Sequence, residues 1–283
     1  MGTQLEVILT GTGTPIPFPG RAGPGCLVRY GDILLQFDVG RGTAIRLAEL
    51  GTGPARLSAV FLTHHHSDHL VDLADLVMTR WVNRSPSNLP VVAPEGPSAR
   101  FARGLLDLWA EELEARRQHA KRDSLPEMEV HAFQAVPEPV VVWKDGEVVV
   151  SAISVRHQPI EPAVAYRVDT PAGSVVISGD TRVCEEVEQL ATGANVLVHE
   201  ALRRANMRPE AAAFAFVVDY HADTMLLGPM VARAGVDVLM LTHLMPVPMS
   251  PEDAQGFEDD IRAGGFTGTV IVGNDLDAVA IPA

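Results

Sequence analysis

Short apolar runs separated by glycine turns dominate the first sixty residues of the chain. The runs at 27–30 and 33–38 flank a two-residue turn that contains glycine, a pattern that predicts a β-hairpin. Apolar residues recur at helical spacing in residues 44–51, and a buried strand is expected over 57–63. The first part of the chain is therefore expected to be rich in strands.

The later chain alternates helical and strand-like patterns. Residues 70–82 carry apolar side chains at helical spacing, and residues 98–122 predict one longer amphipathic helix with a basic C-terminal end. Because helices and strands alternate, we expect an α/β fold in which helices pack on sheets. Further strands are expected over residues 140–143, 147–155, 163–169 and 174–178.

The composition is typical of a globular protein. The chain has 283 residues, of which 47% are hydrophobic and 20% charged, enough for the core of one large domain. No apolar run approaches the roughly 18 residues that a membrane span needs. The first residues lack the pattern of a secretory signal, and two cysteines cannot form a disulfide framework. A cytoplasmic location without membrane contact is expected.

The charge balance is acidic. Lys and Arg number 22 against 36 Asp and Glu, which gives a formal net charge of −14. An acidic surface repels polyanions, and nucleic-acid binding draws most of its strength from neutralised phosphates. The charge therefore counts against a nucleic-acid partner.

Candidate chemistry gathers in residues 63–69, THHHSDH, which lie between an apolar strand and a helical pattern. Four of the ten histidines of the chain fall within six of these residues. Neutral imidazoles and carboxylates are good ligands for divalent metals, and a metal would relieve the cost of crowding them together. A fortuitous or tag-like run is disfavoured because tags are terminal. The segment predicts a metal site.

Ligand-type residues also follow other apolar runs. In layered α/β folds, sites gather beyond the carboxyl ends of strands, so these residues are expected to share one cleft with the histidine segment. Each alone is also typical of a structural residue, and for His199 the structural alternative is as well supported as ligation. The residues are His157, Asp180, His199, Glu200 and His243.

The segments TGTGTP, FDVGRGT, THHHSDH, SGDT, LVHEAL, YHADT and LTHL together resemble the metallo-β-lactamase-fold hydrolases. Within them, the chain is similar to the branch that contains tRNase Z and arylsulfatase-like and cyclic-nucleotide phosphodiesterase-like enzymes. The resemblance extends from Leu9 to about Asn274. It implies a four-layer αββα sandwich (metallo-β-lactamase fold), as a single domain over residues 1–283 with a helical insertion near 98–135.

Carried over residue by residue, the resemblance implies a dinuclear metal centre. Two divalent ions are expected, with Zn²⁺ favoured and Mn²⁺ or Fe²⁺ as alternatives. The implied ligands are His64, His66 and His157 for one ion and Asp68, His69 and His243 for the other, with Asp180 as the bridge.

The resemblance also implies catalytic roles for three residues in the hydrolysis of an ester by water activated at the metal centre. Asp68 would orient the water and accept its proton. His221 would donate to a substrate oxygen near the leaving group, and Glu200 would orient His221.

The expected substrate follows from a departure from the tRNase Z pattern. Those enzymes carry a long arm between the third-motif histidine and the bridging aspartate, whereas only 22 residues separate His157 from Asp180. Together with the net charge, this favours a small-molecule ester, with a phosphodiester or sulfate ester first and a lactone, thioester or carbamate as alternatives. A tRNA 3′-processing endonuclease and a non-catalytic metal-binding relative are the alternative functions. A homodimer is common in the branch, and the sequence neither supports nor excludes one.

Overall fold

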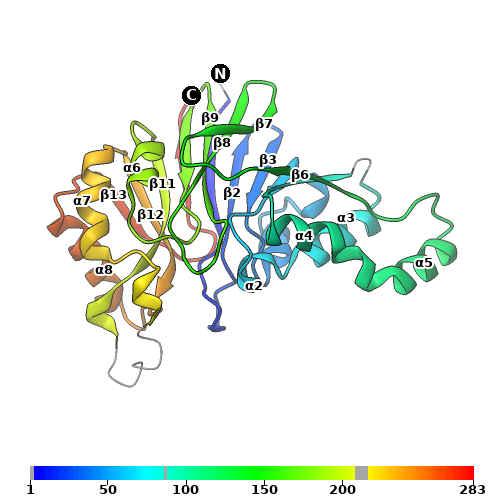
Figure 1. Ribbon diagram of the computed structural model, residues 1–283, viewed down its shortest axis with the longest axis horizontal. Coiled ribbons are helices and arrows are strands. Elements are labelled where there is room, and N and C mark those ends of the chain that lie inside the picture. The colour runs from blue at the N-terminus through cyan, green and yellow to red at the C-terminus, as the bar shows by residue number, and fades with distance from the viewer. Residues whose placement is uncertain (1–2, 86–87, 208–215) are drawn as a thin grey trace.

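Alternation of apolar side chains across the strands builds two seven-stranded sheets that pack face to face (Figure 1). In the first strand, Val7 and Leu9 face the second sheet, whereas Ile8 points to the helices on the outer face. The computed structural model describes residues 3–85, 88–207 and 216–283. The first sheet has the order β14-β1-β2-β3-β4-β5-β6. Its strands are β1 (Leu5–Gly11), β2 (Gly25–Tyr30), β3 (Ile33–Phe37), β4 (Ala59–Phe61), β5 (Leu89–Pro94), β6 (Met128–Phe133) and β14 (Ala278–Ile281).

The second sheet follows the order β13-β12-β11-β10-β9-β8-β7. Strands β10 to β13 run parallel, so their carboxyl ends open at the same edge of the sheet. Strands β3 to β6 of the first sheet are also parallel to one another. The strands of the second sheet are β7 (Val140–Asp145), β8 (Val148–Ser154), β9 (Val164–Thr170), β10 (Gly173–Ile177), β11 (Val196–Leu202), β12 (Val238–Met245) and β13 (Thr269–Val272).

Helices cover the outer face of each sheet. Apolar residues of α1, α3 and α4 pack on the first sheet, and those of α6, α7 and α8 pack on the second. A third cluster lies between the sheets, so the layers are helix, sheet, sheet and helix. The helices are α1 (Thr43–Glu49), α2 (Ser67–Leu70), α3 (Leu73–Val82), α4 (Pro97–Gly104), α5 (Ala110–His119), α6 (Glu185–Ala191), α7 (Thr224–Ala234) and α8 (Pro251–Ala263), with short 3-10 turns at η1 (Pro54–Arg56), η2 (Leu105–Trp109) and η3 (Arg204–Asn206).

This architecture confirms the predicted αββα sandwich and the hairpin of β2 and β3. The prediction of one continuous helix over residues 98–122 is wrong. The segment forms α4, the 3-10 turn η2 and α5, and the break begins at Gly104. Glycine weakens a helix interior because it loses the most backbone entropy on folding. Among the described residues, no helix is both long and apolar enough to cross a membrane.

A buried phenol joins the two sheets beside the histidine segment. Tyr166 of β9 is fully buried, and its hydroxyl donates a 2.7 Å hydrogen bond to the carbonyl of Leu62. Its ring packs against Phe37 and Phe61 of the first sheet, with ring centroids 5.5 Å apart in both cases. Leu62 lies directly before Thr63, so the bond from Tyr166 fixes the backbone between the end of β4 and the first histidine, His64.

Tyr166→Phe is expected to lower the free energy of unfolding by about 1–3 kcal/mol, because the carbonyl of Leu62 stays buried and loses a donor. Urea unfolding of the two proteins measures the change. Tyr30→Phe, at a half-buried ring at the turn of the hairpin of β2 and β3, serves as the control and should change stability by less than about 0.5 kcal/mol. Equal effects of the two substitutions would contradict the assigned role of the Tyr166 hydroxyl.

Candidate metal centre

The ligand-type side chains meet where strands of both sheets end. The turn after β4 carries His64 and His66, and it leads into the single helical turn α2, which carries Asp68 and His69. The second sheet supplies the remaining residues. They are His157 after β8, Asp180 after β10, Glu200 in β11, His221 before α7 and His243 in β12.

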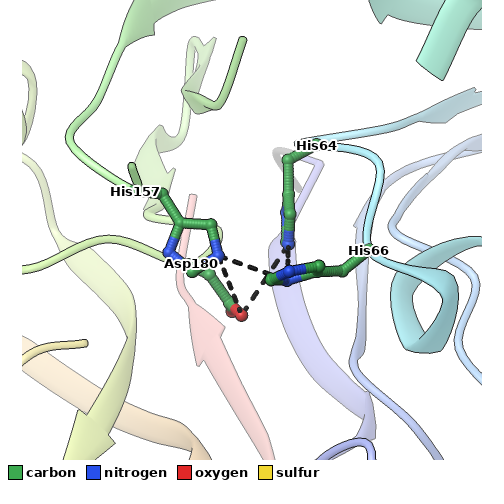
Figure 2. A group of neighbouring side chains, drawn as sticks. All are labelled: His64, His66, His157 and Asp180. Carbon is green, nitrogen blue, oxygen red and sulfur yellow. Dashed lines mark hydrogen bonds and ion pairs between the residues drawn. The ribbon is translucent and has the colours of Figure 1, made fainter. Parts of the chain in front are cut away.

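Three imidazoles and one carboxylate form the first group (Figure 2). His66 Nδ1 lies 3.0 Å from His64 Nε2 and 3.2 Å from His157 Nε2. The Oδ2 atom of Asp180 lies 3.8 Å from the His64 nitrogen and 3.9 Å from the His157 nitrogen. Nitrogens on a tetrahedral zinc ion at 2.0–2.1 Å stand roughly 3.3 Å apart, so these spacings fit a shared cation.

A second group lies on the other side of Asp180. Asp68 Oδ2 lies 3.4 Å from His243 Nε2 and 3.7 Å from His69 Nε2. The same Asp180 Oδ2 atom lies 3.3 Å from His69 Nε2 and 3.5 Å from His243 Nε2. One carboxylate oxygen therefore faces both groups, which is the arrangement that a bridging ligand requires.

Hydrogen bonds outside the centre fix which nitrogen of each ring faces it. Thr63 donates its hydroxyl proton to Asp38, so it accepts the Nδ1 proton of His64 at 2.9 Å. The Nδ1 proton of His157 goes to the carbonyl of Tyr220 at 3.1 Å. Because these Nδ1 atoms are donors, the Nε2 lone pairs of His64 and His157 point into the centre, ready for a metal.

Burial keeps the first group in the form that binds metals. Burial first, and the neighbouring His69 second, lower the pKa of His64 well below its ordinary value. Burial lowers the pKa of His66 to about 4. Both imidazoles are thus neutral at pH 7, as metal ligands must be.

One nitrogen in the second group lacks the partner that a cation would supply. His69 Nε2 is buried and has no well-directed hydrogen bond to any part of the chain that the structure describes. The nearest acceptors are the carboxylates of Asp180 and Asp68, at 3.3 and 3.7 Å, so two histidines and two acids are packed together in this group. Divalent metal ions suit this donor set, since they would satisfy the nitrogen and neutralise the carboxylates.

Asp38 is a functional residue that the sequence motifs do not single out. Its Oδ1 accepts the backbone N–H of Thr63, and its Oδ2 accepts the Thr63 hydroxyl and His69 Nδ1–H at 2.8 and 2.7 Å. Asp38 adopts a positive φ of 52°, a conformation that aspartate tolerates better than most residues. The available signal is its place directly after β3, the same strand-end position that marks the other ligands.

His221 and Glu200 form a pair beside the centre. Glu200 Oε1 accepts His221 Nδ1–H at 2.8 Å and the backbone N–H of Thr181 at 3.0 Å. A ring nitrogen of His221 lies within 4.8 Å of ligand atoms of Asp180 and His243. His199 instead lies outside these groups, with its Nδ1–H bonded to the carbonyl of Glu200 at 2.7 Å.

Comparisons with known proteins agree with this fold and site. A family model described as a beta-lactamase superfamily domain matches residues 37–244. Ribonuclease Z of Mycobacterium bovis (strain BCG / Pasteur 1173P2) is 36% identical over 284 residues, covering 98% of this chain and 99% of the relative. Ribonuclease Z of Mycobacterium marinum is 35% identical and covers 99% and 100% of the two chains.

Solved structures share the fold at lower identity. The metallo-beta-lactamase fold protein YhfI from Bacillus subtilis superposes with a TM-score of 0.73 at 20% identity, over 98% of this chain and 99% of its own. Human tRNase Z, short form, gives a TM-score of 0.68 at 20% identity, over 98% and 100% of the two chains.

These relatives overturn two expectations from the sequence. A small-molecule ester substrate and the exclusion of nucleic acid are both wrong, because the full-length relatives are ribonucleases. The short spacing of His157 and Asp180 does not argue against a ribonuclease. The alignment of 284 residues covers nearly all of both chains, so the relative has no room for a long arm that this chain lacks. The net charge is misleading because it averages the whole surface, whereas charges in water act over about 8 Å at physiological ionic strength.

Asp38→Asn is expected to weaken divalent-metal binding by roughly 10- to 100-fold. Asp38 accepts from three donors through two oxygens, whereas the amide has one oxygen, and its NH2 group would face at least one of the three donors. Competition with a chelating dye measures the affinity. The matched control is Asp72→Asn, which removes a carboxylate that accepts the backbone N–H of Ala44 at 2.8 Å in α1. Wild-type affinity in the Asp38 variant would refute its orienting role.

Proposed function

Since the chain belongs to the beta-lactamase superfamily and, within it, to the ribonuclease Z family, we propose that it is an endonuclease that removes the 3′ trailer from precursor tRNA. The match with proteins named ribonuclease Z over 98% of the chain carries this proposal. Family membership makes the chain a metal-dependent hydrolase that acts on phosphodiester bonds. The fold shared with human tRNase Z is further support for tRNA as the substrate.

The ligand assignment in this proposal places two divalent ions on either side of Asp180. The inward-facing nitrogens and the short distances between the ligand atoms support it. Zn²⁺ suits such imidazole-rich sites, and elemental analysis separates it from Mn²⁺ and Fe²⁺. The assigned ligands are His64, His66 and His157 for one ion, Asp68, His69 and His243 for the other, and Asp180 for both.

The protein residues prepare the attack on the phosphodiester. Ions at these positions would supply a more acidic water and stabilise charge on the phosphate oxygens. Asp68 orients the attacking water and accepts its proton. Burial would raise the pKa of Asp68, but the hydrogen bond from His243 and the nearby His69 lower it on balance, so its carboxylate is ionised at neutral pH.

The pair of His221 and Glu200 acts at the other end of the breaking bond. Glu200 holds the Nδ1 proton of His221, so Nε2 is the atom available to the substrate. When it acts as the acid, His221 carries a proton on both ring nitrogens: Nδ1–H stays hydrogen-bonded to Glu200, and the Nε2 proton goes to the departing ribose oxygen, which leaves as the 3′-hydroxyl of the tRNA.

His66→Ala is expected to reduce cleavage of precursor tRNA by roughly 10³-fold or more, because several kcal/mol of charge stabilisation depend on the ion it holds. Single-turnover assays on gels give the rate, and elemental analysis gives the metal content. His65→Ala is the matched control: His65 is the neighbouring histidine that belongs to neither ligand group, and its variant should cleave at the wild-type rate. Cleavage by both variants at the wild-type rate would refute the ligand assignment.

His221→Ala is expected to lower kcat on precursor tRNA by roughly 10²- to 10⁴-fold while the metal content stays constant. With bis(p-nitrophenyl) phosphate the loss should be much smaller, because nitrophenolate departs without a proton. Equal losses on the two substrates would show that His221 does not protonate the leaving group.

A further inference from the structure

An aromatic ring lies beside the metal centre with no role in the chemistry described so far. Tyr220 directly precedes His221, and its ring centroid lies 4.6 Å from that of His221 and 5.1 Å from that of His157. The ring is half-buried, so one part packs on these imidazoles and the remainder stays open to solvent.

The backbone fixes this ring relative to the catalytic atoms. The carbonyl of Tyr220 accepts the Nδ1 proton of His157 at 3.1 Å, and the next residue is held by Glu200. The backbone of Tyr220 is therefore anchored beside the site, and its ring packs on the imidazoles of His157 and His221.

Hydrogen bonding by its hydroxyl does not explain why a tyrosine occupies position 220. No hydrogen bond of this oxygen occurs within residues 3–85, 88–207 and 216–283, whereas the buried hydroxyl of Tyr166 has a carbonyl partner. A second aromatic ring, Phe216, lies 6.2 Å from the Tyr220 ring at an interplanar angle of 34° and is 56% exposed. The two rings extend an apolar, aromatic surface outward from the catalytic histidines.

Contact with a base is a second way, besides contact with a phosphate, to hold an RNA at this site. Stacking of a base on an aromatic ring needs no cation and accepts every base, since each has a π-face. An aromatic wall beside the scissile bond could thus hold single-stranded RNA in place.

We propose that Tyr220 is the platform on which the base of the nucleotide just 5′ of the scissile bond stacks. This inference rests on the proposed function. The side of the bond follows from His221: its proton goes to the 3′-oxygen of that nucleotide, and Tyr220 adjoins His221. Tyr220 is thus a substrate-positioning residue that acts on a base and not on a phosphate.

The test combines Tyr220→Leu with a precursor tRNA whose nucleotide 5′ of the cleavage site is abasic. Single-turnover kcat/KM is measured for wild type and variant on normal and abasic substrates. Tyr220→Leu should lower the value for the normal substrate by roughly 5- to 150-fold, the range of base–aromatic stacking. The abasic substitution should cost wild type a similar factor, and the two changes together should cost no more than either alone.

Structural damage gives a different result from loss of stacking. A variant that merely distorts His157 would lose the same factor on both substrates, so the two losses would multiply, and that outcome overturns the inference. Tyr220→Phe keeps the ring and should cleave like wild type. Trp109→Leu removes another exposed aromatic side chain, in η2 between α4 and α5, and should not affect cleavage.

The wild type on the normal substrate tests the proposed function by itself. If it fails to cleave precursor tRNA, the endonuclease proposal falls and the stacking role falls with it. If it cleaves and Tyr220→Leu has no effect, only the stacking role is overturned.

Discussion

The centre of this molecule depends on keeping buried imidazoles and carboxylates close together. Ligand atoms of His64, His66, His157 and Asp180 lie within 4.8 Å of one another, and most of these side chains are fully buried. Unpaired charge at such density would be strongly unfavourable, and neutral nitrogens facing one another lack donors. The fold stabilises the arrangement because acceptors outside the centre accept the Nδ1 protons of His64, His69 and His157. The Nε2 lone pairs and the carboxylates then remain free to bind cations.

Much of this centre can be predicted from the sequence because its residues occupy a repeated position, the end of an apolar run. His157, Asp180 and His243 are all predicted in this way, and the structure brings them to the same place. Asp38 occupies the same kind of position after β3, but a lone carboxylate after a strand has no metal-ligand spacing to distinguish it. Its role appears only through its three hydrogen bonds, which join residues far apart in sequence.

The end of a helix and the identity of the substrate cannot be predicted from local sequence patterns alone. The segment 98–122 has helical periodicity throughout, yet a 3-10 turn interrupts the α-helix after Gly104. Periodicity reports which side chains can be buried, and tertiary packing decides where the helix ends. The substrate is a similar case: net charge and loop spacing are sums over the chain, whereas recognition of RNA depends on the few side chains beside the scissile bond.

The last strand of the chain ties the two sheets together. Strand β14 comes after the last strand of the second sheet but pairs with β1 of the first, with Leu5 opposite Ile281 and Ile8 opposite Ala278. A hinge opening between the two sheets would have to break this ladder and the bond from Tyr166 to Leu62. The relative position of the two sheets, and with it the spacing of ligand residues that come from both, is therefore held by bonds far from the centre as well as by bonds within it.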